Sequence, residues 1–371
     1  MTKILLIGAT GYIGGTVLDH LINSEVTSLG GLTFDLLVRS KDAIEKLNRA
    51  YGDRIKPILW TGFADLPFIT DTSTNYDIII NAGTGFMLDG TKALIHGLTR
   101  RIRPGTPVPW LIHISGCTNL SDCPATQTPY PDREWDDTDG HAVYELLKNE
   151  DAQDPYPQRT TEVGVLAAAE ETGVQAVSIN APWIFGKGRG LFNKQGVVHI
   201  LAMRYVLQHG YGYKVNDTAN INWVHVEDLA DVFVLIVRAI LEREDRGVGY
   251  IPSGTRGIIF PEVGSMLITQ IMQECLDTAF AAGVLPREDT PKEKEIRFVG
   301  VQEIADELMG GLVEVADRLA GHMKMKGTTA RRLLGWNPTR LDEARLQDYV
   351  DTLELLKNGQ VLDTLQKCVG K

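Results

Sequence analysis

Short, continuously apolar runs alternate with helix-like segments along the first half of this 371-residue chain. The runs are predicted to be strands, and they lie at residues 3–7, 33–38, 58–60, 76–80, 108–114 and 175–180. Apolar residues recur at helical spacing between them, notably at 12–22, 91–103 and 160–172. Continuously apolar strands are typical of parallel sheets that are covered on both faces. The pattern therefore predicts an α/β fold with a doubly wound parallel sheet.

Helical spacing dominates the second half of the chain. It predicts helices at 197–209, 266–282 and 304–323, and a long apolar helix that ends near residue 240. A chain of 371 residues is longer than one hydrophobic core usually serves. We therefore expect a second, smaller and mostly helical domain beside the sheet.

Three glycines follow the first strand at the spacing G-x-x-G-x-x-G. Gly8 permits a tight turn, Gly11 lets the backbone approach a pyrophosphate, and Gly14 lets helix and strand pack closely. The N-terminus of the next helix offers unpaired N–H groups and a partial positive charge to phosphates. An ordinary strand-to-helix turn is the alternative, but the strand before and the helix after favour a dinucleotide site. Its predicted residues are Gly8, Thr10, Gly11, Tyr12, Ile13 and Gly14.

The second predicted strand ends in Arg39-Ser40-Lys41. In dinucleotide folds an acidic residue near this point binds the ribose 2′-hydroxyl of NAD, whereas an arginine accommodates the 2′-phosphate of NADP. Arg39 and Ser40 therefore predict NADP as the cofactor, with NAD as the weaker choice. A solvated basic turn is the other interpretation.

The segment Gly-Ala-Thr-Gly-Tyr-Ile-Gly-Gly at 8–15 resembles the short-chain dehydrogenase/reductase superfamily, and within it the extended (NAD-dependent epimerase/dehydratase-like) and atypical (NmrA-like) branches. Asn81-Ala82-Gly83 resembles the superfamily's Asn-Ala-Gly motif, and Pro182 lies in a turn similar to the one that relatives fold over the nicotinamide. Residues 330–338 resemble the closing Leu-Gly-Trp-x-Pro signature of extended members. The resemblance implies a Rossmann sheet and adds Asn81, Ala82, Gly83 and Pro182 to the cofactor site.

The resemblance also implies a domain division. Residues 222–228 are similar to the segment with which extended members return to the main domain. We thus expect residues 1–186 to form the dinucleotide-binding domain, with 222–252 returning to it. Residues 187–221 and 253–345 would form the smaller substrate domain, and 346–371 a C-terminal helix. From residue 118 to about 155 the chain lacks apolar periodicity, which predicts a long loop, a lid near the nicotinamide.

Relatives that catalyse redox steps use a serine or threonine, a tyrosine and a lysine. The usual hydroxyl position falls on Gly116, so Ser115 or Thr118 would have to substitute for it. Tyr156 stands in register for the tyrosine. Thr160 replaces the lysine that should follow one turn later, although Arg159 could supply a charge.

Tyr144 heads a literal Tyr-x-x-x-Lys with Lys148, but it lies too far upstream of the sixth strand. The resemblance therefore implies Tyr156, rather than Tyr144, as the proton donor. Ile221 stands where sugar-nucleotide enzymes of the extended branch carry an arginine for the substrate pyrophosphate. An apolar residue cannot hold a diphosphate, so nucleotide sugars are not expected as substrates.

Composition narrows the possible partners. A net charge of -11 argues against nucleic acid, and no apolar run approaches the roughly 20 residues that span a bilayer. A strand that begins at residue 3 leaves no room for a signal peptide ahead of it, so a cytoplasmic monomer or homodimer is expected. The four cysteines show no metal-binding spacing, and no metal is expected.

Three functions fit this pattern. The first is an NADP-dependent oxidoreductase acting on a small-molecule carbonyl or alcohol. The second is an enzyme that keeps the nucleotide but performs an isomerisation, dehydration or cyclisation. The third is an NmrA-like cofactor sensor without turnover. The incomplete triad weakens the first, while the distinct second domain weakens the third.

Overall fold

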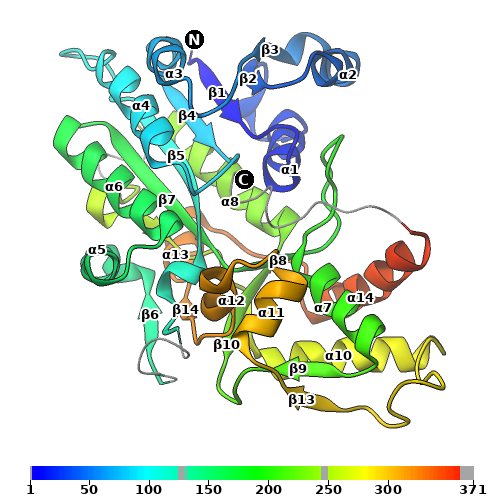
Figure 1. Ribbon diagram of the computed structural model, residues 1–371. Coiled ribbons are helices and arrows are strands. Elements are labelled where there is room, and N and C mark those ends of the chain that lie inside the picture. Colours follow the sequence, from blue (N-terminus) through cyan, green and yellow to red (C-terminus); the bar gives the residue numbers. More distant parts are fainter. Residues whose placement is uncertain (1, 124–129, 131, 244–249, 360–371) are drawn as a thin grey trace.

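Seven parallel strands form the main sheet of the computed structural model, which describes residues 2–123, 130, 132–243 and 250–359 (Figure 1). Their order across the sheet is β11-β7-β5-β4-β1-β2-β3, which confirms the predicted doubly wound Rossmann topology. The strands are β1 (Ile4–Ile7), β2 (Phe34–Val38), β3 (Ile55–Leu59), β4 (Ile78–Asn81), β5 (Trp110–Gly116), β7 (Gln175–Ala181) and β11 (Ile258–Ile259).

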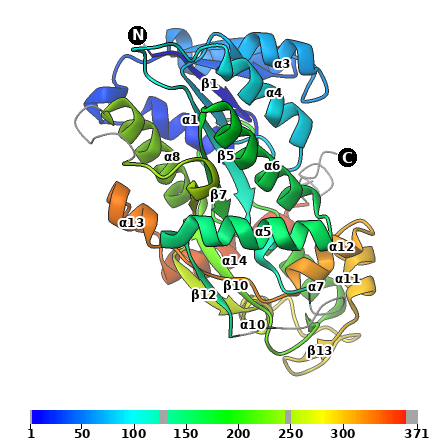
Figure 2. The same cartoon turned by 90° about the vertical axis from the view of Figure 1, so that its left-hand side faces the viewer.

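Helices cover both faces of this sheet (Figure 2), and every strand except the edge strand β3 has buried side chains on both faces. One core lies under α1 (Tyr12–Ile22), α2 (Lys41–Tyr51) and α8 (Val226–Leu241). The other lies under α3 (Leu66–Ser73), α4 (Leu88–Thr99) and α6 (Pro157–Thr172). Successive residues of β1 alternate between the two cores, as expected for a strand with a side-chain period of two.

The small domain contains a second sheet of β12 (Gly264–Leu267), β10 (Asn220–His225) and β8 (Trp183–Phe185), in that order. A separate parallel pair joins β9 (Gly212–Lys214) to β13 (Ile296–Phe298). The helices of this domain are α7 (Val198–His209), α10 (Ile268–Ala281), α11 (Val301–Leu308), α12 (Val313–Leu319) and α14 (Asp342–Lys357). Figure 1 shows this domain below the main sheet.

The structure shifts several predicted boundaries. Strand β11 lies in the main sheet, so the returning segment extends beyond residue 252, while β10 at its start belongs to the second sheet. Helix α14 begins at Asp342 and packs on α7 and α10 of the small domain, and residues 360–371 of the predicted C-terminal helix lie outside the described residues. The single helix expected at 304–323 is two helices, because Gly310 and Gly311 both adopt positive φ angles between them.

The long loop expected from 118 to 155 is wrong over its second half. This half contains β6 (Glu134–Asp136), which pairs with β14 (Lys324–Lys326), and the helix α5 (Gly140–Gln153). The Asp139 carboxylate caps α5 by accepting the Ala142 N–H at 3.1 Å. Only one narrow stripe of α5 is buried, at Gly140, Val143, Tyr144 and Leu147, which is why its periodicity is weak in the sequence. Residues 124–129 and 131 of the predicted loop lie outside the described part.

No helix among the described residues combines the length and the apolar character that crossing a membrane would require.

Candidate functional site

The glycine turn after β1 has no room for side chains. Gly8 has φ +98°, and a Cβ there would lie 2.6 Å from the carbonyl oxygen of Ala82. A Cβ at Gly14 would lie 2.3 Å from the carbonyl oxygen of Gly8, to which the Gly11 N–H donates at 2.8 Å. The turn therefore brings strand β1, helix α1 and the loop after β4 into backbone contact.

Helix α1 begins directly on this turn with its N-terminus uncapped. No side chain accepts the first N–H groups, and the first turn contains no acidic residue. Such an end provides free donors and a partial positive charge for an anion. The predicted residues Thr10, Gly11, Tyr12 and Ile13 are half-buried at this end, so the residues present fit the pyrophosphate of a dinucleotide.

The loop after β8 closes over the first turn of α1. The Tyr12 hydroxyl donates to the carbonyl oxygen of Gly186 at 2.6 Å, and the Arg189 N–H donates to Thr16 Oγ1 at 3.2 Å. A Cβ at Gly15 would meet the Cα of Gly190 at 3.1 Å. Tyr12 thus fixes the position of a small-domain loop beside the glycine turn.

Arg39 and Ser40 lie exposed just beyond the end of β2. Ser40 caps α2, since its hydroxyl accepts the Ala43 N–H at 3.4 Å. Within the part of the chain that the structure describes, Arg39 makes no hydrogen bond or ion pair. Its guanidinium is therefore available to a phosphate.

Asn81 shapes the loop after β4 from a buried position. Its Oδ1 accepts the Gly83 N–H at 3.2 Å, and its Nδ2 donates to the Thr84 carbonyl oxygen at 3.0 Å and to His113 Nδ1 at 3.1 Å. Burial lowers the pKa of His113 to about 4, so this imidazole is neutral. These bonds hold Ala82 and Gly83 against the Gly8 turn.

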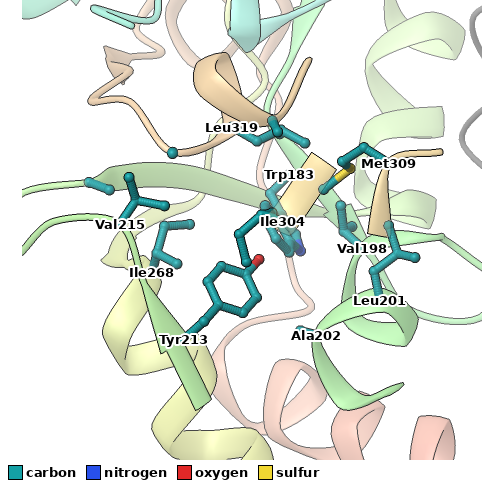
Figure 3. A pocket seen from close by; sticks show the side chains of 13 residues that line it. Trp183, Val198, Leu201, Ala202, Tyr213, Val215, Ile268, Ile304, Met309 and Leu319 are labelled. Atoms are coloured by element: carbon teal, nitrogen blue, oxygen red, sulfur yellow. The ribbon is translucent and has the colours of Figure 1, made fainter. Parts of the chain in front are cut away.

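Pro182 is buried where the main sheet passes into the second sheet, between β7 and β8. The next residue, Trp183, lines a small cavity of about 20 Å³ inside the small domain, which is room for roughly one water molecule. Figure 3 shows the Tyr213 ring and its hydroxyl pointing toward the Trp183 indole across this space. The remaining lining is apolar, and it includes Val198, Leu201, Ile268, Ile304, Met309 and Leu319.

A chain of hydroxyl groups lies where β5 ends and α6 begins. Tyr156 directly precedes α6, is only 2% exposed, and places its hydroxyl 3.3 Å from Thr118 Oγ1. Thr118 donates to Gln158 Oε1 at 2.8 Å, so the proton between the two hydroxyls belongs to Tyr156. Two predicted catalytic residues, Tyr156 and Thr118, are thereby brought together.

Gln158 occupies the space that the expected hydroxyl would need. A Cβ at Gly116 would lie 2.8 Å from Gln158 Nε2, and a Cβ at Gly85 would lie 3.4 Å from the same atom. The Gln158 amide therefore connects β5, α6 and the loop after β4. Nothing in the sequence pattern marks this residue.

Ser115 belongs to a buried cluster around Glu162 rather than to the Tyr156 chain. Its hydroxyl donates to Glu162 Oε2 at 2.9 Å. Glu162 is fully buried and also accepts from Ser178 Oγ at 2.6 Å, Asn119 Nδ2 at 2.6 Å and Asn180 Nδ2 at 3.0 Å. Burial raises the pKa of Glu162, and these four bonds lower it in part. Sequence reasoning missed this cluster.

Arg159 is fully buried and joins α6 to α5. Its Nη1 donates to Glu150 Oε2 at 3.0 Å, and its Nη2 donates to the Asp154 carbonyl oxygen at 2.6 Å. Thr160 also turns toward α5, because its hydroxyl donates to Asp151 Oδ1 at 2.8 Å. Neither side chain takes the place of the missing lysine beside Tyr156.

A cation from the small domain does lie over Tyr156. Arg318, in α12, places its Cζ 4.3 Å from the centroid of the Tyr156 ring and pairs with Asp154 at 2.7 Å. Burial raises the pKa of Tyr156, while the Arg318 charge lowers it. Sequence reasoning missed Arg318, which is 164 residues from Asp154 along the chain.

Tyr144 is buried on α5, away from these groups. Its ring stacks on His141 with centroids 6.3 Å apart, and Lys148 Nζ lies 5.9 Å from the ring while pairing with Glu145. None of the contacts described for Tyr144 or Lys148 reaches the glycine turn or Tyr156. The literal Tyr-x-x-x-Lys motif therefore has local partners on its own helix.

Comparison with known proteins agrees with this architecture. Residues 135–249 match the model of the NAD dependent epimerase/dehydratase family. A curated relative, oxidase ucsJ from Acremonium sp, is 27% identical over 351 residues, covering 91% of this chain and 92% of the relative.

Among solved structures, dTDP-glucose 4,6-dehydratase DesIV from Streptomyces venezuelae superposes with a TM-score of 0.61 at 12% identity, covering 96% of this chain and 97% of that one. UDP-glucose 4-epimerase from Thermotoga maritima superposes with a TM-score of 0.58 at 14% identity, covering 97% and 100%. At these identities the superpositions show the fold alone. Together with the family match and the curated relative, they confirm the predicted resemblance to the extended branch of the short-chain dehydrogenase/reductase superfamily.

Proposed function

We propose that this protein is an NADP-dependent oxidoreductase that acts on a small-molecule carbonyl or alcohol. The observation that carries the proposal is the Tyr156–Thr118–Gln158 chain at the carboxyl edge of the main sheet. Gln158 reaches the loop after β4, and that loop contacts the glycine turn. A proton donor therefore lies on the same edge of the sheet as the predicted nucleotide site, and the relative named as an oxidase supports a redox reaction.

The residues that would hold the cofactor follow from the geometry. The glycine turn and the α1 N-terminus would bind the pyrophosphate, and Arg39 would bind the 2′-phosphate. The Asn81–Gly83 loop would pack against the bound cofactor. When bound, NADP supplies or accepts the hydride. The protein contributes the binding site, the orientation and the proton.

Tyr156 is the proposed proton donor to the substrate oxygen. Burial raises its pKa above the ordinary value of 10, so the phenol stays protonated at neutral pH. A protonated phenol can act as a general acid for carbonyl reduction, whereas alcohol oxidation needs the phenolate as base. Reduction should accordingly be the favoured direction at neutral pH, and oxidation should speed up as the pH rises.

A non-redox step is the second candidate, and one observation favours it. Among the described residues no lysine contacts Tyr156, and its ring is almost completely buried, so the phenol lacks the neighbour that helps it to abstract protons in relatives. An isomerisation, dehydration or cyclisation by an enzyme that keeps the nucleotide would not need rapid proton abstraction by Tyr156. A cofactor-bound protein that transfers no hydride to any carbonyl compound would favour this second candidate.

NADPH is expected to bind more tightly than NADH, because Arg39 is exposed and unpaired within the described chain. Replacing Arg39 with alanine removes one charge-assisted hydrogen bond to the phosphate, which should cost about 1.5–3 kcal/mol. The loss should appear for NADPH only. Fluorescence titration of wild type and Arg39→Ala with both reduced cofactors measures it, and equal wild-type affinities would contradict the proposal.

Nucleotide sugars are expected not to bind. Ile221 is 1% exposed in β10, where it pairs with Met266 of β12, so the position offers a diphosphate no charge. Calorimetry with UDP-glucose and with dTDP-glucose, each in the presence of saturating NADP, should show no heat of binding. A micromolar Kd for either would refute the prediction.

A further inference from the structure

Arg318 is fixed on the Tyr156 ring from two sides. It lies on α12, the helix of the small domain that contacts the 3-10 turn Cys117–Leu120 (η3) of the main domain. Its Nη2 donates to Asp154 Oδ2 at 2.7 Å, and Asp154 lies two residues before Tyr156. The Ser121 hydroxyl donates to the Arg318 carbonyl oxygen at 2.7 Å. Backbone and side chain are thus both held against the main domain.

The guanidinium is nevertheless left partly unsatisfied. Arg318 is 3% exposed, and its buried Nε and Nη1 have no hydrogen-bond partner among the residues that the structure describes. Leaving buried charged donors unpaired is costly, so purely structural arginines are usually saturated. Arg331 provides the comparison, since it lies 5.0 Å from the Trp336 ring while both of its Nη atoms bond to Glu262.

The other groups around Tyr156 do not supply a positive charge. Glu314 on α12 raises the pKa of Tyr156, and Asp151 of α5 accepts the Tyr156 N–H at 3.1 Å. The Cys117 thiol on η3 is neutral over the working range, because burial raises its pKa to about 12. Asp154 is the counter-ion of Arg318. Arg318 is therefore the cation that faces the ring within the described residues.

We propose that Arg318 of the small domain supplies the positive charge that holds Tyr156 ready for proton transfer, in place of a lysine on α6. The inference rests on the proposed function, in which Tyr156 meets the substrate. Arg318 acts through Tyr156 and is a positioning residue. The proton-transfer site is then complete only when the small domain is docked on the main domain, since its charge and its phenol come from different domains.

The test follows the ionisation of residue 156 itself. We would incorporate 3,5-difluorotyrosine at position 156 of the full-length protein, since fluorine brings the phenol pKa within reach and its 19F signal reports ionisation. Losing a cation about 4–6 Å away should raise the midpoint by at least one unit, a tenfold fall in the acid dissociation constant. Arg318→Met is expected to show this rise, and Arg318→Lys to show less than half of it.

Arg331→Met is the matched control, because it removes an arginine over an aromatic ring in the same part of the chain. It should leave the midpoint unchanged. An unchanged midpoint in Arg318→Met, or an equal rise in Arg331→Met, would overturn the inference. If Arg318→Met does not fold, Arg318→Gln is titrated in its place, because glutamine removes the charge but remains polar, and a midpoint equal to that of wild type would overturn the inference.

The titration needs no turnover, so it separates this inference from the proposed function. A midpoint that responds to Arg318 in a protein without hydride transfer supports the inference and defeats the oxidoreductase proposal. Hydride transfer together with a midpoint that is unchanged in Arg318→Met supports the oxidoreductase proposal and overturns this inference.

Discussion

Replacing Tyr156 with phenylalanine is expected to lower turnover by about 10²–10⁴-fold, the usual contribution of a positioned general acid or base. The change removes one hydroxyl from the Tyr156–Thr118–Gln158 chain and keeps the ring that packs against Arg318. None of the described contacts of that hydroxyl reaches the glycine turn, so NADPH affinity should be nearly unchanged. Steady-state kinetics with an accepted carbonyl substrate and fluorescence titration of NADPH measure the two effects.

Tyr144→Phe is the matched control, because Tyr144 is also a buried tyrosine, and the ring contacts described for it are with His141 and Lys148 of its own helix α5. Its turnover should stay close to that of wild type. The opposite pattern, a large loss for Tyr144→Phe and a small one for Tyr156→Phe, would identify the literal Tyr-x-x-x-Lys motif as the working one. No loss from either change would count against both tyrosines as proton donors.

Replacing Glu162 with alanine is expected to lower the free energy of unfolding by about 3–5 kcal/mol. The change removes the carboxylate that accepts from the Asn119 and Asn180 amides, at about 1–3 kcal/mol for each lost bond, although Asn119 Nδ2 keeps its bond to Ser115 Oγ. It also opens a cavity between α6 and the sheet. Urea unfolding followed by circular dichroism measures the loss. A loss below about 1 kcal/mol would mean that water replaces the carboxyl group without strain.

Glu162→Gln is the matched variant, and pH separates it from wild type. Because folding raises the pKa of Glu162 above its ordinary value of 4.5, the native state holds this proton more tightly than the unfolded state does. Wild-type stability should therefore fall as the pH rises from 4.5 toward the raised value, and then level off. Glutamine keeps an acceptor for the amides and can donate to Ser178 once that hydroxyl turns. This variant should be stable and should lack that part of the decline.

The glycine turn illustrates what local sequence determines. The sequence predicted a strand at 3–7 and a helix at 12–22, and the structure has β1 at Ile4–Ile7 and α1 at Tyr12–Ile22. Strand, turn and helix are contiguous there, so the signals for each lie within a few residues. Helix α5 shows the opposite case, because its short buried stripe gives little periodicity and the acidic residues before it suggest a loop.

The groups of the candidate site were only partly predictable for a related reason. Tyr156 and Thr118 could be named because each lies at the end of a predicted element. Gln158 and Arg318 could not, since a hydrophobic pattern does not indicate which polar side chains meet across elements. Arg318 lies on α12, which Gly310 and Gly311 separate from α11, and the sequence pattern did not show this break.

The order in which the strands of the sheets follow one another along the chain also affects how the protein folds during its synthesis. Strand β11 completes the main sheet only after residue 250. Helix α8, which packs beside α1 on one face of the sheet, begins at Val226. When the first 186 residues have left the ribosome, one face of their sheet still lacks its largest apolar helix. Strand β6 also lacks its pairing partner at that stage, because β14 follows nearly two hundred residues later in the chain. Such late, long-range pairings fold slowly and leave apolar surface uncovered in the meantime. The nascent chain should therefore depend on chaperones until its last quarter has been synthesised.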